Sequence, residues 1–111
     1  MTDAARSEAV EQFARLTRRF ESDPTVSFGT GFGSSPGLRV RGKIFAMLAG
    51  EALVVKLPKG RVEELVASGV GAAFDPGHGR VMKEWVTVPV GRATDWEELT
   101  ADAFAFVAGR T

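Results

Sequence analysis

The sequence has no cysteine and no tyrosine, and it has one histidine among 111 residues. The absence of cysteine excludes disulfide bonds, thiolate metal sites and a cysteine nucleophile, and it suits a reducing compartment. The formal net charge is zero, so no overall field attracts a nucleic acid or a membrane. No segment approaches about 18 consecutive apolar residues, and the N-terminal segment mixes acids with bases. We therefore expect a cytoplasmic protein with neither membrane span nor signal peptide.

The composition is that of a folded domain. Hydrophobic residues make up 44% of the chain and charged residues 25%, which are ordinary values for a globular protein. The length fits one hydrophobic core rather than two. We therefore expect residues 1–111 to form a single domain.

A helix is predicted over residues 3–21. Its apolar side chains recur at spacings of three and four, which builds one stripe from Val10, Phe13, Leu16 and Phe20. The Asp23-Pro24 pair ends this helix, because proline disfavours a helical conformation in the residue before it. A short strand is predicted over residues 25–28.

From residue 38 the hydrophobic period becomes two, which predicts a β-hairpin over residues 38–57 with its turn at Gly50-Glu51. Strict alternation divides the first arm into two faces. The inner face would hold Leu38, Val40, Ile44, Ala46 and Leu48. The outer face would hold Arg39, Arg41, Lys43, Phe45 and Met47, with Gly42 at a bulge or a bend between two shorter strands.

Three further elements follow the hairpin: a short helix over 60–68, a strand over 85–90 and a closing helix that begins near Asp95. Gly69 stands where a left-handed residue commonly ends a helix. Hairpin-connected strands favour an antiparallel sheet with helices packed on it. The predicted fold class is therefore α+β: an antiparallel sheet packed with an N-terminal, a middle and a C-terminal helix.

No motif for catalysis or for a cofactor is found. The glycine-rich loop over residues 29–37 runs toward strands rather than into a helix, so it lacks the geometry of a phosphate loop. His78 has no partner of the kind that a catalytic base or a metal site needs. We interpret it as a solvated turn residue, and the alternative is weak anion binding with Arg80 and Lys83. We predict a non-enzymatic binding or regulatory module with no metal and no cofactor.

The outer strand face gathers four cations: Arg39, Arg41, Lys43 and Lys56. One interpretation is an ordinary solvated edge that discourages aggregation. The alternative is a nucleic-acid-binding surface, since such cations contact phosphates.

Apolar side chains share that face. Phe45, Met47 and Val54 would form an exposed cluster, and exposed clusters of this kind usually need a cover. A helix of the same chain or a second copy of the chain would supply one. We predict a homodimer through this face, with another partner protein as the alternative. Trp85, at the start of a strand, is interpreted as a core or interface anchor. The alternative is a platform for a small ligand or an anion in a cleft near residues 78–85.

Three segments carry a family resemblance: residues 42–46, 53–57 and 74–85, the last containing the histidine among glycines and then Met82. Together they resemble the N-terminal domain of TfoX/Sxy proteins, and the layout is similar to the YjbR (MmcQ) family. The resemblance covers about residues 25–108. It implies a compact α+β domain, sometimes described as DNA-binding or regulatory, with no established enzymatic activity. The TfoX regulators carry a separate C-terminal domain that these residues do not include.

Overall fold

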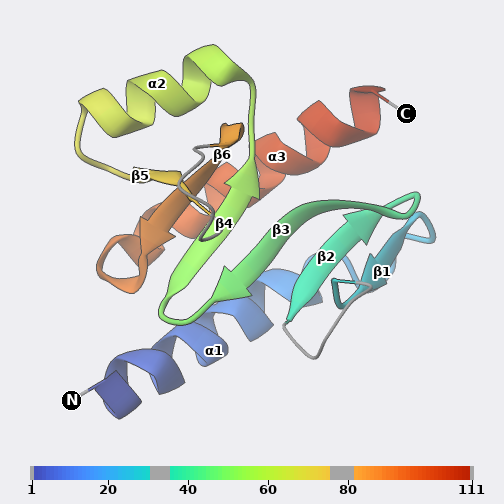
Figure 1. Cartoon of the computed structure of the whole chain (residues 1–111). Coiled ribbons are helices and arrows are strands. Elements are labelled where there is room, and N and C mark those ends of the chain that lie inside the picture. Colours follow the sequence, from blue (N-terminus) through green and yellow to red (C-terminus); the bar gives the residue numbers. More distant parts are fainter. Residues whose placement is uncertain (1, 31–35, 76–81, 111) are drawn as a thin grey trace.

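The computed structural model describes residues 2–30, 36–75 and 82–110, with the side chains of residues 2 and 3 left aside. Six strands form one antiparallel sheet in the order β1-β2-β3-β4-β6-β5 (Figure 1). The strands are β1 (Val26–Phe28), β2 (Gly37–Val40), β3 (Lys43–Ala49), β4 (Ala52–Lys56), β5 (Ala72–Phe74) and β6 (Met82–Pro89). The helices are α1 (Thr2–Arg18), α2 (Lys59–Ala67), the 3-10 helix η1 (Val90–Asp95) and α3 (Trp96–Arg110). The α+β prediction is confirmed.

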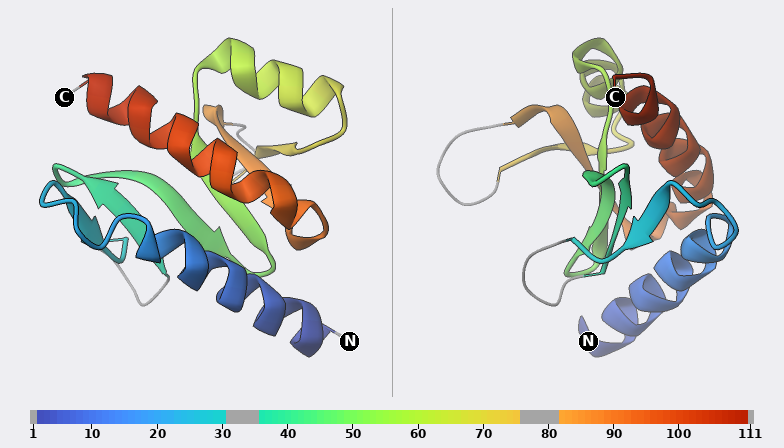
Figure 2. Two further views of the ribbon diagram at one scale, coloured as in Figure 1. Left: turned by 180° about the vertical axis from the view of Figure 1, so that it is seen from behind. Right: turned by 90° about the vertical axis from the view of Figure 1, so that its right-hand side faces the viewer.

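Two helices cover one face of the sheet. Viewed along the sheet, α1 and α3 lie together on one side of it (Figure 2). The third helix, α2, lies near the end of the sheet formed by β5 and β6. Within residues 2–30, 36–75 and 82–110, no helix covers the face of the central strands opposite α1 and α3.

The main core lies between α1, α3 and the sheet. The buried side of α3 presents Trp96, Leu99, Ala103 and Val107, at the three- and four-residue spacing of an amphipathic helix. Trp96 also donates a hydrogen bond from Nε1 to the carbonyl oxygen of Pro89 at 3.2 Å, which fixes the start of the helix to the end of β6.

The stripe predicted for the first helix is wrong at one position. Val10 is 47% exposed, whereas Ala9, Phe13 and Leu16 are buried. At 3.6 residues per turn Ala9 lies in line with Phe13 and Leu16, whereas Val10 lies about 100° to the side of Ala9 and so faces away from the core. The helix also ends at Arg18 rather than Glu21.

Two tight hairpins join β2, β3 and β4. Val40 pairs with Lys43, so the loop between them consists of Arg41 and Gly42, with φ of 50° and 83°. Positive φ at both positions is the signature of a type I′ turn, whose twist matches that of the strands. This confirms that Gly42 marks a bend between two shorter strands. At the second hairpin Met47 pairs with Val54, as predicted.

The prediction that Phe45 lies on the outer face is wrong. Leu38 pairs with Ala46 but Arg39 pairs with Ile44, so Phe45 is an extra residue in β3, a β-bulge. Phe45 and Ala46 are consecutive and both fully buried. The ring of Phe45 meets those of Phe20 and Phe104, each at 5.4 Å between centroids. Beyond the bulge the alternation reverses, which moves Ile44 off the core face.

The remaining elements fit the prediction with shifts at their ends. Gly69 has φ of 81°, which confirms the left-handed residue after α2. The strand predicted from Trp85 begins at Met82, and β5 and η1 were not predicted. Within the described ranges, no helix is long and apolar enough to span a membrane.

Candidate functional site

A groove of about 690 Å³ lies where β3 and β4 separate. These strands pair from Ala46 and Val55 toward their turn, and their other ends diverge in front of the C-terminal end of α3 (Figure 1). Residues from both sheet and helix line it: Thr30, Arg39, Gly42, Lys43, Ile44, Lys56, Trp85, Val107 and Arg110. We call it the basic groove, after its four cationic side chains.

The β-bulge explains why Arg39 and Ile44 meet in this groove. They are register partners beyond the bulge, on the face opposite the buried Leu38 and Val40. Lys56 and Trp85 are likewise register partners, on β4 and β6. Lys56 follows the fully buried, core-facing Val55, so it points to the other side of the sheet.

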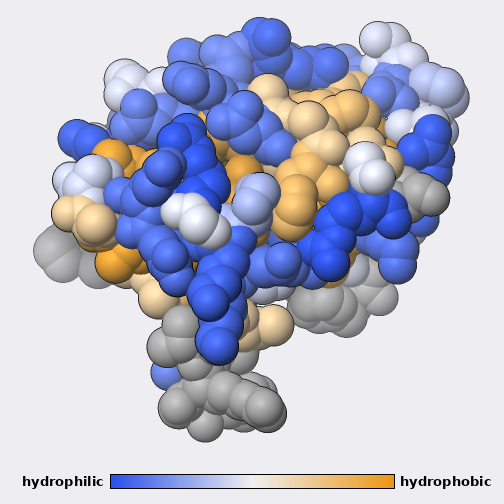
Figure 3. Space-filling model, turned by 90° about the horizontal axis from the view of Figure 1, so that it is seen from above, coloured by the Kyte–Doolittle hydropathy of each residue, from blue (hydrophilic) through white to orange (hydrophobic). Residues whose placement is uncertain are grey.

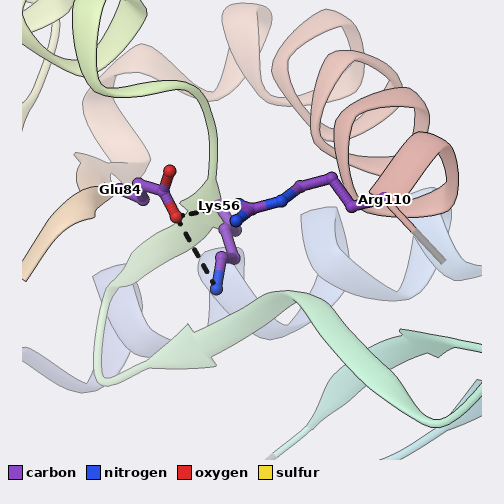
Figure 4. Close-up of polar contacts among 3 residues, drawn as sticks. All are labelled: Lys56, Glu84 and Arg110. Carbon is purple, nitrogen blue, oxygen red and sulfur yellow. Dashed lines mark hydrogen bonds and ion pairs between the residues drawn. The ribbon is translucent and has the colours of Figure 1, made fainter.

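Two of the cations share one carboxylate. Arg110 Nη1 donates to Glu84 Oε1 at 3.0 Å, and Lys56 Nζ lies 4.0 Å from the same oxygen (Figure 4). Arg110 stands in the last turn of α3, where a cation is favoured by the helix dipole. All three side chains are between 31% and 53% exposed, so these ion pairs add little to stability. Their main effect is instead that the carboxylate of Glu84 offsets one positive charge at the groove.

An aromatic ring adjoins these charges. Lys56 Nζ lies 5.5 Å from the centroid of the Trp85 ring, within the range of a cation–π interaction. Trp85 is half-buried, as is Ile44. The groove therefore combines cations with a flat aromatic surface.

The other two cations retain unused donors. Arg39 Nη2 donates to the carbonyl oxygen of Phe28 at 3.4 Å, but its buried Nε has no hydrogen-bond partner among the described residues. Lys43 is exposed and makes no ion pair within those residues. Four cations and the single carboxylate of Glu84 leave three net positive charges at the groove. An anionic ligand would be attracted to it.

The structure brings together three of the four cations predicted as a nucleic-acid surface. Arg39, Lys43 and Lys56 line the groove, whereas Arg41 lies at the hairpin turn and does not. Arg110 and its partner Glu84 were not predicted. Arg110 is 54 residues from Lys56 in sequence, and only the packing of α3 across the sheet brings the two together.

The predicted interface cluster is not an exposed surface in the single chain. Phe45 and Val54 are fully buried, and Met47 is half-buried. Trp85 lies in the basic groove instead. The homodimer stays a prediction, but the apolar cluster that suggested it does not lie open to a partner.

One residue of the predicted anion site, Lys83, falls within the described part of the chain. His78 and Arg80 lie outside the described residues. Lys83 is exposed and lines a second groove of about 340 Å³ between α2 and the β5–β6 edge, with mainly apolar walls that include Val66 and Met82. Lys83 therefore does not belong to the basic groove.

Hydrophobic residues also reach the surface around α2 and α3. Seen from above, they gather in a patch bordered by hydrophilic residues (Figure 3).

No group of three or more histidine, aspartate or glutamate side chains in the described ranges is placed to hold a metal ion. The basic groove is therefore the place where charged and aromatic side chains converge.

Comparison with known proteins identifies the family. The YjbR family model matches residues 21–104, about three quarters of the chain. The chain belongs to the YjbR family. This confirms the resemblance drawn from the sequence, and the TfoX N-terminal domain is part of the same superfamily. No curated protein and no solved structure matched the chain. The YjbR match includes Arg39, Lys43, Lys56 and Trp85 but stops before Arg110.

Proposed function

We propose that this YjbR protein is a non-enzymatic binding module whose basic groove binds single-stranded nucleic acid. One observation carries the proposal: cations from β2, β3, β4 and α3 converge on a single groove that also holds Trp85. The four cations come from four different elements, so the fold itself gathers them, and a solvated strand edge would not need that arrangement.

The chemistry of the groove suits a nucleic-acid strand. Lysine and arginine neutralise phosphates and release the counterions condensed on them, which supplies most of the affinity of such complexes. Bases of a single strand are free to stack on aromatic side chains, and each such contact contributes about 1–3 kcal/mol. Trp85, with Lys56 beside its ring, offers both interactions at one point.

A small phosphate-bearing ligand is the second candidate. A volume of about 690 Å³ lies in the range that is common for small-molecule sites. A mononucleotide would place its phosphate among the cations and its base against Trp85. The two candidates share the groove and differ in whether one nucleotide suffices.

Fluorescence anisotropy of a labelled oligothymidylate tests the proposal. We expect binding at low salt and weaker binding by Arg39→Ala, Lys43→Ala and Lys56→Ala. Lys59→Ala is the matched control, because Lys59 is exposed and lies outside the basic groove. Its replacement removes the same charge from a different part of the surface. Equal affinities for the Lys56 and Lys59 variants would contradict the proposal. Displacement of the oligonucleotide by micromolar mononucleotide would favour the second candidate.

Trp85 supplies an intrinsic reporter. The chain has two tryptophans, and Trp96 is 1% exposed and held by its hydrogen bond to Pro89. A ligand in the groove should therefore change the emission of Trp85 and leave that of Trp96 unaltered. The emission change should disappear in Trp85→Phe.

A further inference from the structure

Among the described residues, Glu84 is the one carboxylate in contact with the cations of the basic groove. Its Oε1 atom accepts the hydrogen bond of Arg110 and lies within ion-pair distance of Lys56 (Figure 4). The two cations come from α3 and β4, and both line the groove. Glu84 thus pairs, with one negative charge, with two of the cations that a ligand phosphate in the groove would contact.

We propose that Glu84 is an internal competitor, which selects ligands that bring two or more negative charges into the groove. The inference rests on the proposed function and names the class of ligand that the groove accepts. Such ligands include a phosphate monoester dianion, a pyrophosphate group and successive phosphodiesters of a strand. Ligands with a single carboxylate are rejected.

The selection follows from charge balance. A ligand carboxylate that replaces Glu84 restores the same single charge between Lys56 and Arg110, so the exchange gains no Coulomb energy. A doubly charged group gains an additional attraction to the same two cations, and its extra oxygens are acceptors for other donors. One such donor is Lys43, which lines the groove, is exposed and makes no ion pair within the described residues.

Glu84 can leave this position at small cost. Its side chain is 37% exposed, so water reaches the carboxylate when it turns away. Ion pairs between partly exposed side chains are weak and are screened by salt. The backbone of Glu84 remains fixed by the hydrogen bond from Leu57 N to its carbonyl oxygen at 2.9 Å, so only the side chain needs to move.

Three variants test the inference by anisotropy with labelled oligothymidylate at low salt. Glu84→Gln should tighten binding roughly fivefold, the effect of removing one weak ion-pair competitor. Glu84→Asp keeps the charge but shortens the side chain, so it should tighten binding by a smaller factor. Glu51→Gln removes the same charge at the β3–β4 turn, the opposite end of that hairpin from the groove, and should leave affinity nearly unchanged. Circular dichroism of each variant checks that the fold is intact.

Competition with small anions gives a second readout. Pyrophosphate should displace the oligonucleotide from the natural protein, whereas acetate at equal ionic strength should not. In Glu84→Gln acetate should become an effective competitor, because the internal carboxylate is gone.

The outcomes separate this inference from the proposed function. If Glu84→Gln and Glu51→Gln bind oligothymidylate with equal affinity while Lys56→Ala and Arg110→Ala still weaken binding, the proposed competition by Glu84 is wrong. The groove then remains the binding site. If neither the natural protein nor any variant binds the oligonucleotide or pyrophosphate, both are wrong. Binding that appears only in Glu84→Gln would support the competitor.

Discussion

Replacement of Phe45 by alanine should lower the free energy of unfolding by about 4 kcal/mol. Truncation of a buried phenylalanine costs about 3–5 kcal/mol, through lost burial and the cavity left behind. Phe45 is 0% exposed, and it also loses ring contacts to Phe20 and Phe104. Each such contact contributes about 0.5–1.5 kcal/mol beyond burial. A domain of this size has about 5–15 kcal/mol in total, so the loss is large.

Urea unfolding followed by circular dichroism measures this loss as a lower midpoint at an unchanged slope. Phe45→Leu retains most of the volume and should cost less, which keeps the comparison available if the alanine variant does not fold. Val10→Ala is the control, because Val10 is 47% exposed. A cost below about 1 kcal/mol for Phe45→Ala would refute the bulge, since strict alternation places this ring outside the core. The position of Arg39 in the groove would then also be wrong.

Three further substitutions test other parts of the fold. Thr100→Val should raise the free energy of unfolding by up to about 1 kcal/mol in urea, because the buried Oγ1 of Thr100 has no partner among the described residues. Gly71→Ala should lower it by about 1–3 kcal/mol, since the added carbon would lie 2.9 Å from the carbonyl oxygen of Thr87. Thr25 donates from its hydroxyl at 2.6 Å and its backbone N–H at 2.8 Å to Asp23, which holds the pKa of that carboxyl below 3.8. That stability is present above pH 3.8 and is lost as the pH falls through the lowered pKa, so Thr25→Val should melt earlier than the natural protein at pH 7, and the difference in melting temperature should narrow as the pH falls below 3.8.

The turns and helices were predictable because local chemistry determines them. Gly42 and Gly69 stand where positive φ is required, and the hairpin pairing of Met47 with Val54 follows from a two-residue loop. The buried stripe of α3 follows from helical spacing. In each case residues close in sequence carry the whole signal.

The bulge could not be predicted, because its cause is distant in sequence. No residue near Phe45 in the sequence shows that its side chain points into the core. The rings that it contacts there belong to Phe20 and Phe104. A bulge reverses the side chains beyond it, so one missed residue placed Phe45 on the outer face, whereas Met47 and Val54, on the turn side of the bulge, pair as predicted.

Part of the basic groove could be predicted from residues close in sequence, and the rest depends on contacts between residues far apart in sequence. Arg39, Lys43 and Lys56 were found because they alternate along one hairpin. Arg110 was missed because it reaches the groove only through the packing of α3, and Glu84 was read as part of a family segment rather than as its partner. The alternating cations in the sequence predicted a basic face on the hairpin. The tertiary structure shows that three of these cations line one groove together with Arg110.

The cluster of positive charge at the groove is compatible with a net charge of zero for the whole chain. A net charge of zero argues against a general attraction to nucleic acid. It does not oppose a local one, because exposed charges farther away than about 8 Å are largely screened at physiological salt. Binding that depends on a few clustered cations should therefore be confined to the groove and sensitive to each of them.

The salt dependence of oligothymidylate binding tests the central claim most directly. For a single strand, the logarithm of affinity falls with that of salt concentration by about 0.7 for each phosphate neutralised. We predict that Lys56→Ala and Arg110→Ala each reduce this slope by about that amount, while Lys59→Ala leaves it unchanged. Equal slopes for all three variants and the natural protein would contradict the account.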